Sequence, residues 1–142
     1  MNKRVFLALP PLAAALLFYG ATAQTPPPPI EPTTTAAGVY TAAQAARGEE
    51  TYMNMCVGCH ATGTYATPAF REKWDRHPLS DLYTLLSETM PKQEPASLTP
   101  QEYAQLIAYL LKINEAPAGT SELGSDLERL KKITIEMPKK KD

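Results

Sequence analysis

Two cysteines and a histidine are grouped in the motif Cys56-Val57-Gly58-Cys59-His60, and the chain has no other cysteine. A C-x-x-C-H motif is typical of covalent haem attachment. Two thiols three residues apart at the end of a helix can bond to the two vinyl groups on one edge of a porphyrin, while the following imidazole coordinates the iron. The motif therefore predicts one haem c, bound covalently through Cys56 and Cys59, with His60 as an axial iron ligand.

Other sites could use the same three side chains. A redox dithiol normally begins a helix after a β-strand, where the helix dipole lowers the thiol pKa, whereas these cysteines follow a predicted helix. A zinc site would need a third and a fourth ligand, for which His77 is the remaining histidine. A structural disulfide would give the adjacent His60 no role. The motif favours haem over these alternatives.

The element that must position the thiols is a helix predicted from Ala42 to about Met55. Thr41 can cap its first turn, with Gln44 reaching back in a capping box. Gly48 in the interior is unfavourable by about 1 kcal/mol relative to alanine, which is usually tolerated where another backbone approaches closely. This helix is therefore expected to cross another element at Gly48.

A loop over residues 61–68 and a short helical turn that buries Phe70 and Trp74 should follow the motif. The next helix is expected to begin after Ser80 as its N-cap. It should end before Met90-Pro91, because a proline disfavours the helical conformation at the preceding residue. Met90 is thus predicted on an extended segment.

The clearest helix signals come last. Thr99 is the expected cap, Pro100 occupies the first helical position and Glu102 closes a capping box. This helix is expected to end near Asn114. Its apolar face follows helical spacing and comprises Tyr103, Leu106, Ile107, Leu110 and Leu111. Together these elements predict an all-α fold of three to four short helices around one covalently attached haem.

The first 23 residues have the pattern of an export signal. Basic residues are followed by an apolar stretch that ends in Ala21-Thr22-Ala23, a site of the kind that signal peptidases cut. We expect cleavage before Gln24 and a periplasmic location. Pro10-Pro11 would disrupt the alternative, an uncleaved anchor helix, so contact with a membrane is expected only if the leader is retained.

The rest of the chain divides by composition into three segments. Residues 24–39 form a Pro/Thr-rich linker expected in polyproline II, residues 40–115 form the haem domain, and residues 116–142 form a tail. In the tail we expect a short helix capped by Ser125. The 142 residues have a net charge of −1, whereas nucleic-acid binding normally requires a basic excess. Nucleic acid is therefore excluded as the expected partner.

From Tyr40 to about Asn114 the chain resembles the class I c-type cytochromes, which are small all-α proteins. Gly48 and Tyr52 resemble the glycine and the aromatic residue of that family's first helix. Tyr109 looks like the aromatic residue of its terminal helix, which packs across the glycine. The resemblance implies the small cytochrome c fold.

The resemblance also assigns residues around the haem. The carbonyl of Pro68 would accept a hydrogen bond from His60 Nδ1, and Met90 would be the sixth iron ligand. Trp74 is expected to pack on the haem edge, and a hydrogen bond from its indole N–H to a haem propionate is the alternative. The alternatives to Met90 as the sixth iron ligand are His77 and a position left open or occupied by water. Arg71 and Arg76 are expected in solvent, or paired with a haem propionate.

Three other methionines could compete with Met90. Met53 and Met55 precede the thiols on the same helix and could not reach the opposite haem face. Met137 lies in the tail, outside the predicted haem domain. Met90 lies between two helices, where its thioether can be presented to the iron.

With two protein ligands on the iron there is no site for a small-molecule substrate, so electron transfer by Fe(III)/Fe(II) cycling is expected rather than catalysis. The opposing hypothesis is a haem enzyme or a gas or redox sensor with a labile sixth ligand. It needs an acid or base beside the haem, for which Glu88 and Glu94 are the nearest in sequence to Met90. A third hypothesis is a subunit of a larger complex.

A closer resemblance suggests the partners. The segments Phe70–Trp74, Met90-Pro91, Asn114–Gly119 and Leu130–Ile135 look like those of small periplasmic cytochromes that accompany quinoprotein (PQQ) dehydrogenases. This implies a quinoprotein dehydrogenase as electron donor and a terminal oxidase or another cytochrome as acceptor.

Overall fold

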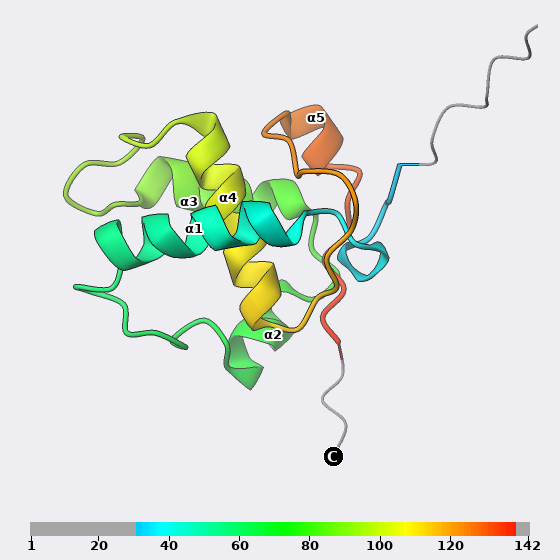
Figure 1. Ribbon diagram of the computed structural model, residues 1–142, viewed down its shortest axis with the longest axis horizontal. Coiled ribbons are helices and arrows are strands. Elements are labelled where there is room, and N and C mark those ends of the chain that lie inside the picture. Colours follow the sequence, from blue (N-terminus) through cyan, green and yellow to red (C-terminus); the bar gives the residue numbers. More distant parts are fainter. Residues whose placement is uncertain (1–30, 139–142) are drawn as a thin grey trace, which may run out of the picture.

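The computed structural model describes residues 31–138, which form five α-helices and one short 3-10 helix and contain no strand (Figure 1). The export signal, its cleavage site and the first part of the predicted linker lie outside these residues. The helices are η1 (Thr35–Ala37), α1 (Ala42–Met55), α2 (Pro68–Trp74), α3 (Leu79–Thr89), α4 (Pro100–Ile113) and α5 (Leu127–Leu130). The predicted all-α fold is confirmed. Of the described helices, none is long and apolar enough to cross a lipid bilayer.

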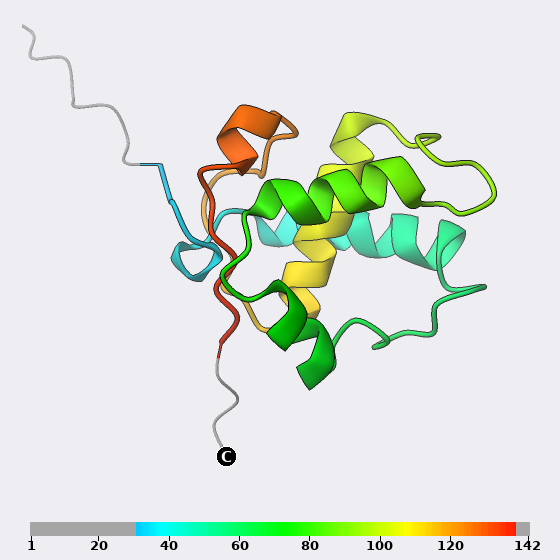
Figure 2. The same ribbon diagram turned by 180° about the vertical axis from the view of Figure 1, so that it is seen from behind.

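Helix α4 is the centre of the fold. In Figure 1 α1 crosses in front of α4, and in Figure 2 α3 lies in front of α4 on the opposite side. The five residues predicted for the apolar face of α4 are all buried, with exposed fractions between 0% and 5%. The capping box of Thr99 and Glu102 is present as predicted. Helix α4 therefore supplies one face to α1 and another to α3.

Gly48 lies where α1 and α4 cross. A Cβ atom at this position would lie 1.9 Å from the carbonyl oxygen of Gln105 in α4. The close backbone approach expected at Gly48 is confirmed. One turn further along α1, the ring of Tyr52 packs against Tyr109 with 5.1 Å between the ring centroids.

Two of the predicted helix caps are wrong. Helix α3 begins at Leu79 after Pro78, so Ser80 lies inside the helix, where it is buried, and does not cap it. Helix α5 is capped by Asp126, whose Oδ1 accepts a hydrogen bond from the Arg129 amide at 2.8 Å, and not by Ser125. The observed N-cap of α3 is two residues before Ser80, and that of α5 is one residue after Ser125.

The capping box predicted at the start of α1 is only half present. Thr41 Oγ1 accepts a hydrogen bond from the Gln44 amide at 3.1 Å, as expected. The Gln44 side chain does not reach back to Thr41 but pairs with the tail: its Nε2 donates to the Leu123 carbonyl and its Oε1 accepts from the Leu123 amide, both at 2.8 Å. Both groups are buried, so the tail satisfies Gln44 and is fastened to α1.

The two ends of the described chain lie against each other. The Thr35 amide donates to the Thr134 carbonyl at 3.0 Å, and the Thr134 amide donates to the Thr33 carbonyl at 2.8 Å. Thr35 is fully buried, and its hydroxyl bridges the amide and carbonyl of Glu136. The second part of the predicted linker is therefore not a free polyproline spacer, because its backbone is paired with residues 134–136.

Replacing Gln44 by methionine should destabilise the protein by about 2 kcal/mol. The change keeps the length of the side chain but leaves the buried amide and carbonyl of Leu123 without partners. Urea unfolding measures the loss, and hydrogen exchange should show faster exchange of the Leu123 amide. The control is Gln101→Met on the exposed side of α4, and equal stability of the two variants would contradict the prediction.

Candidate functional site

An apolar cleft of about 810 Å³, measured out to its open mouth, lies between α1, α3 and α4. Apolar and aromatic side chains predominate in its walls. The lining residues are Tyr52, Met55, Cys56, Cys59, His60, Tyr65, Leu86, Met90, Pro91, Lys92, Gln93, Leu98, Tyr103, Leu106 and Leu110.

The thiols and the imidazole of the motif enter this cleft from the end of α1. Cys56 is the C-cap of the helix, and its amide donates to the Tyr52 carbonyl at 2.8 Å. The chain then turns tightly, since the amides of Cys59 and His60 both donate to the Cys56 carbonyl, at 3.1 and 2.9 Å. Both cysteines are free thiols, with Cys56 half-buried and Cys59 exposed. The turn thus brings all three side chains to one wall.

The environment of the thiols differs from that of a redox dithiol. Burial raises the pKa of the Cys56 thiol, and the motif follows the C-terminus of α1, where the helix dipole disfavours a thiolate. The structure also gives no support to a zinc site. Among residues 31–138 no group of three or more His, Cys, Asp or Glu side chains is placed to hold a metal ion. His77 is exposed beside Asp81, with 3.6 Å between Nδ1 and Oδ2, and does not line the cleft.

Met90 enters the cleft from the end of α3. It is extended, with φ −130° and ψ 146°, as Pro91 led us to expect. Its carbonyl accepts a hydrogen bond of 2.7 Å from the Tyr103 hydroxyl of α4. Of the competing methionines, Met55 also lines the cleft but is 52% exposed, whereas Met53 and Met137 do not line it.

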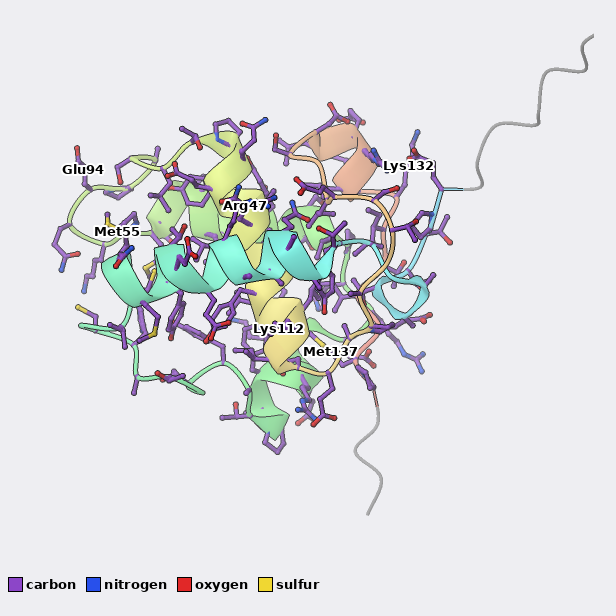
Figure 3. All side chains as sticks on the ribbon, in the orientation of Figure 1. Arg47, Met55, Glu94, Lys112, Lys132 and Met137 are labelled. Atoms are coloured by element: carbon purple, nitrogen blue, oxygen red, sulfur yellow. The ribbon has the colours of Figure 1, made fainter. Side chains whose placement is uncertain are left out.

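Figure 3 separates two of these methionines clearly. The labelled Met55 lies at the edge of the molecule where the loop with Glu94 also lies, and the labelled Met137 lies near the C-terminal segment. Met137 is partly buried against the hydrophobic core, so this part of the tail is packed onto the helices. Met137 therefore contributes to packing and does not line the cleft.

His60 is held by two tyrosines, neither of which the sequence had assigned to it. The Tyr52 hydroxyl donates to the His60 carbonyl at 2.9 Å, and burial raises the pKa of Tyr52 to about 12, so this phenol stays protonated. The Tyr65 hydroxyl lies 2.9 Å from His60 Nδ1. The partner of the imidazole is thus Tyr65, and the hydrogen bond predicted for the carbonyl of Pro68 is not present: Pro68 begins α2 and does not line the cleft.

Trp74 also lies outside the cleft. It is buried, with its ring 6.3 Å from that of Phe70 and 6.0 Å from that of His77 between centroids. The two ring contacts are core packing, and Trp74 does not line the cleft. Arg71 Nε donates to Asn114 Oδ1 at 3.1 Å, and the side chain of Arg76 is 89% exposed. Neither arginine lines the cleft.

The side chains that line the cleft fit a haem. Two thiols at one wall suit thioether bonds, and the imidazole and the thioether enter from different helices, which suits the two axial positions of an iron. The leucines of α3 and α4 suit the apolar ring. Glu88 and Glu94, the acid or base candidates of the haem-enzyme hypothesis, are exposed and do not line the cleft.

Comparison with known proteins gives one family. Residues 43–110 match the family model described as "Cytochrome C oxidase, cbb3-type, subunit III". The matched segment runs from the start of α1 into α4 and so includes the cysteine motif and Met90. No curated protein and no solved structure matches the chain.

Proposed function

We propose that this chain, whose residues 43–110 match a cytochrome c domain, is a one-electron carrier with a single haem c. The observation that carries the proposal is that Cys56, Cys59, His60 and Met90 all line one apolar cleft. The cysteines would hold the haem covalently, and His60 and Met90 would be the axial ligands. The haem, when bound, supplies the Fe(III)/Fe(II) couple.

The protein's own residues fix and shield that site. Tyr103 holds the backbone of Met90 through its 2.7 Å hydrogen bond, which keeps the thioether directed into the cleft. Tyr52 holds the backbone of His60. Leu86, Leu106 and other apolar side chains exclude water from the walls, and a methionine ligand raises the reduction potential relative to two histidines.

The partners follow from this role and from the sequence. A periplasmic carrier would take electrons from a quinoprotein dehydrogenase and pass them to a terminal oxidase or to another cytochrome. The match to a family named after a cytochrome oxidase subunit supports the oxidase side of this route. The exposed Cys59 and Met55 at the mouth of the cleft support transient contact through a small interface, below about 1,200 Å².

The absorption spectrum of the purified protein, oxidised and reduced, tests the proposal. A low-spin c-type spectrum with the far-red sulfur-to-iron band, unchanged by carbon monoxide, is the expected result. A high-spin spectrum that changes at once with carbon monoxide would overturn the carrier role and favour a haem enzyme or sensor. A protein without covalent haem would overturn the proposal as a whole.

Replacing Met90 by alanine should remove the far-red band and let carbon monoxide bind the reduced protein. The fold should persist, because Met90 is only half-buried at the end of α3. Visible spectra with and without carbon monoxide measure the change. Met53→Ala is the matched control, since Met53 is 48% exposed on α1 and outside the cleft; a Met90→Ala protein that keeps the band would show that another residue is the ligand.

A further inference from the structure

We infer that Tyr65 is the positioning residue that orients the His60 imidazole and tunes its strength as a ligand, an inference that rests on the proposed haem site. The phenol oxygen lies 2.9 Å from His60 Nδ1, and the two rings are in contact, with 5.4 Å between their centroids. Tyr65 also lines the cleft. No other hydrogen bond to the His60 ring is present among residues 31–138.

The direction of this hydrogen bond follows from the iron. If Nε2 coordinates the metal, the ring proton of a neutral imidazole must be on Nδ1. The His60 Nδ1–H group therefore donates to the Tyr65 oxygen. A partner of this kind fixes the tautomer and the orientation of a ligating histidine and raises its basicity.

Tyr65 is itself held in place by groups outside the cleft. Its carbonyl accepts a hydrogen bond of 2.7 Å from Asn114 Nδ2, and its ring packs against Phe70 at 5.5 Å between centroids. Asn114 is fully buried, donates to the Leu110 carbonyl at 2.8 Å and accepts from Arg71 Nε at 3.1 Å. The loop that carries Tyr65 is thus anchored to the end of α4, so the phenol has a fixed position relative to His60.

A more basic imidazole stabilises the oxidised iron more than the reduced iron. The hydrogen bond from His60 to Tyr65 therefore lowers the reduction potential, and its loss should raise it. Tyr65→Phe removes only the phenol oxygen and keeps the ring that packs between His60 and Phe70. The variant thus separates the hydrogen bond from the packing.

The test is a redox titration of the haem-loaded full chain. Tyr65→Phe should shift the Fe(III)/Fe(II) equilibrium roughly tenfold toward the reduced form, which is about 59 mV for a one-electron couple. Tyr83→Phe is the matched control, because its hydroxyl donates to the Pro100 carbonyl at 3.4 Å, away from the cleft. A potential for Tyr65→Phe equal to that of the control would overturn the inference.

A second measurement uses the unchanged protein and does not depend on how the variant folds. In the reduced, diamagnetic state, proton NMR should show a nuclear Overhauser effect between the Nδ1 proton of His60 and the ring of Tyr65. Its absence would overturn the inference even if the carrier role holds. Failure of the proposed function is distinguishable, because the unchanged protein would then lack covalent haem or bind carbon monoxide at once.

Discussion

Replacing Cys56 and Cys59 together by serine is expected to abolish covalent haem attachment. Serine hydroxyls do not form thioether bonds, and the chain has no other cysteine. Without the haem, the leucines and tyrosines that line the cleft would face water, and a domain of this size has little stability to spare. Both haem content and stability should therefore fall steeply.

Haem staining of a denaturing gel measures the attachment, and circular dichroism during heating measures the stability. Met53→Ser is the control, because Met53 is on α1 close to the motif but is 48% exposed and outside the cleft. It should retain full staining. Covalent haem in the double serine variant would contradict the assignment of the two cysteines.

Replacing Gly48 by alanine should lower the free energy of unfolding by about 3 kcal/mol. The added Cβ would lie 1.9 Å from the carbonyl oxygen and 2.4 Å from the carbonyl carbon of Gln105. These are backbone atoms of α4, so α1 and α4 would have to separate. Overpacking of this kind is unfavourable by about 1–3 kcal/mol or more and should exceed the gain of about 1 kcal/mol in helix propensity from glycine to alanine.

For a domain of this size the melting temperature should fall by roughly 10–20 °C, measured by circular dichroism on the haem-loaded protein. Gly124→Ala is the control, because no heavy atom lies within 4 Å of its added Cβ. Equal melting temperatures for the two variants would show that α1 and α4 can adjust at the crossing.

The parts of the fold that could be predicted depend on signals within one segment. Thr99, Pro100 and Glu102 place the start of α4, and the helical spacing of its apolar residues gives its buried face. The interior glycine at position 48 indicated a close approach because it has few other uses in a helix. What the sequence could not supply was the partner, Gln105, since helical spacing does not say which helix crosses which.

Two of the wrong predictions concern groups that had a choice of hydrogen-bond partners. Gln44 could close a capping box or bind the tail, and the buried tail backbone of Leu123 decides the outcome. Likewise, the composition around Thr35 predicts a linker, because the sequence does not show its hydrogen bonds with residues 134 and 136. These contacts join positions from 79 to 101 residues apart, and no periodicity in either segment indicates them.

Some residues of the candidate site could be predicted from the sequence, and one could not. Cys56, Cys59 and His60 are adjacent in the chain, and Met90 is marked by the proline that follows it, so their placement around one cleft could be expected. The role of Tyr65 could not be predicted, because its distance from His60 depends on a loop that Asn114 anchors at the C-terminal end of α4. A tyrosine five residues after a histidine in a loop has no characteristic pattern.

The paired ends of the described chain also determine how the molecule could be attached to something else. Residues 33–35 and 134–136 lie side by side, at the edge opposite the loop of Pro91–Leu98 that borders the cleft (Figures 1 and 2). A linker joined to either end, whether to an electrode or to a fused enzyme, would therefore be attached on the side of the molecule away from that loop. The same geometry makes the two ends interchangeable as attachment points for building a wired biosensor.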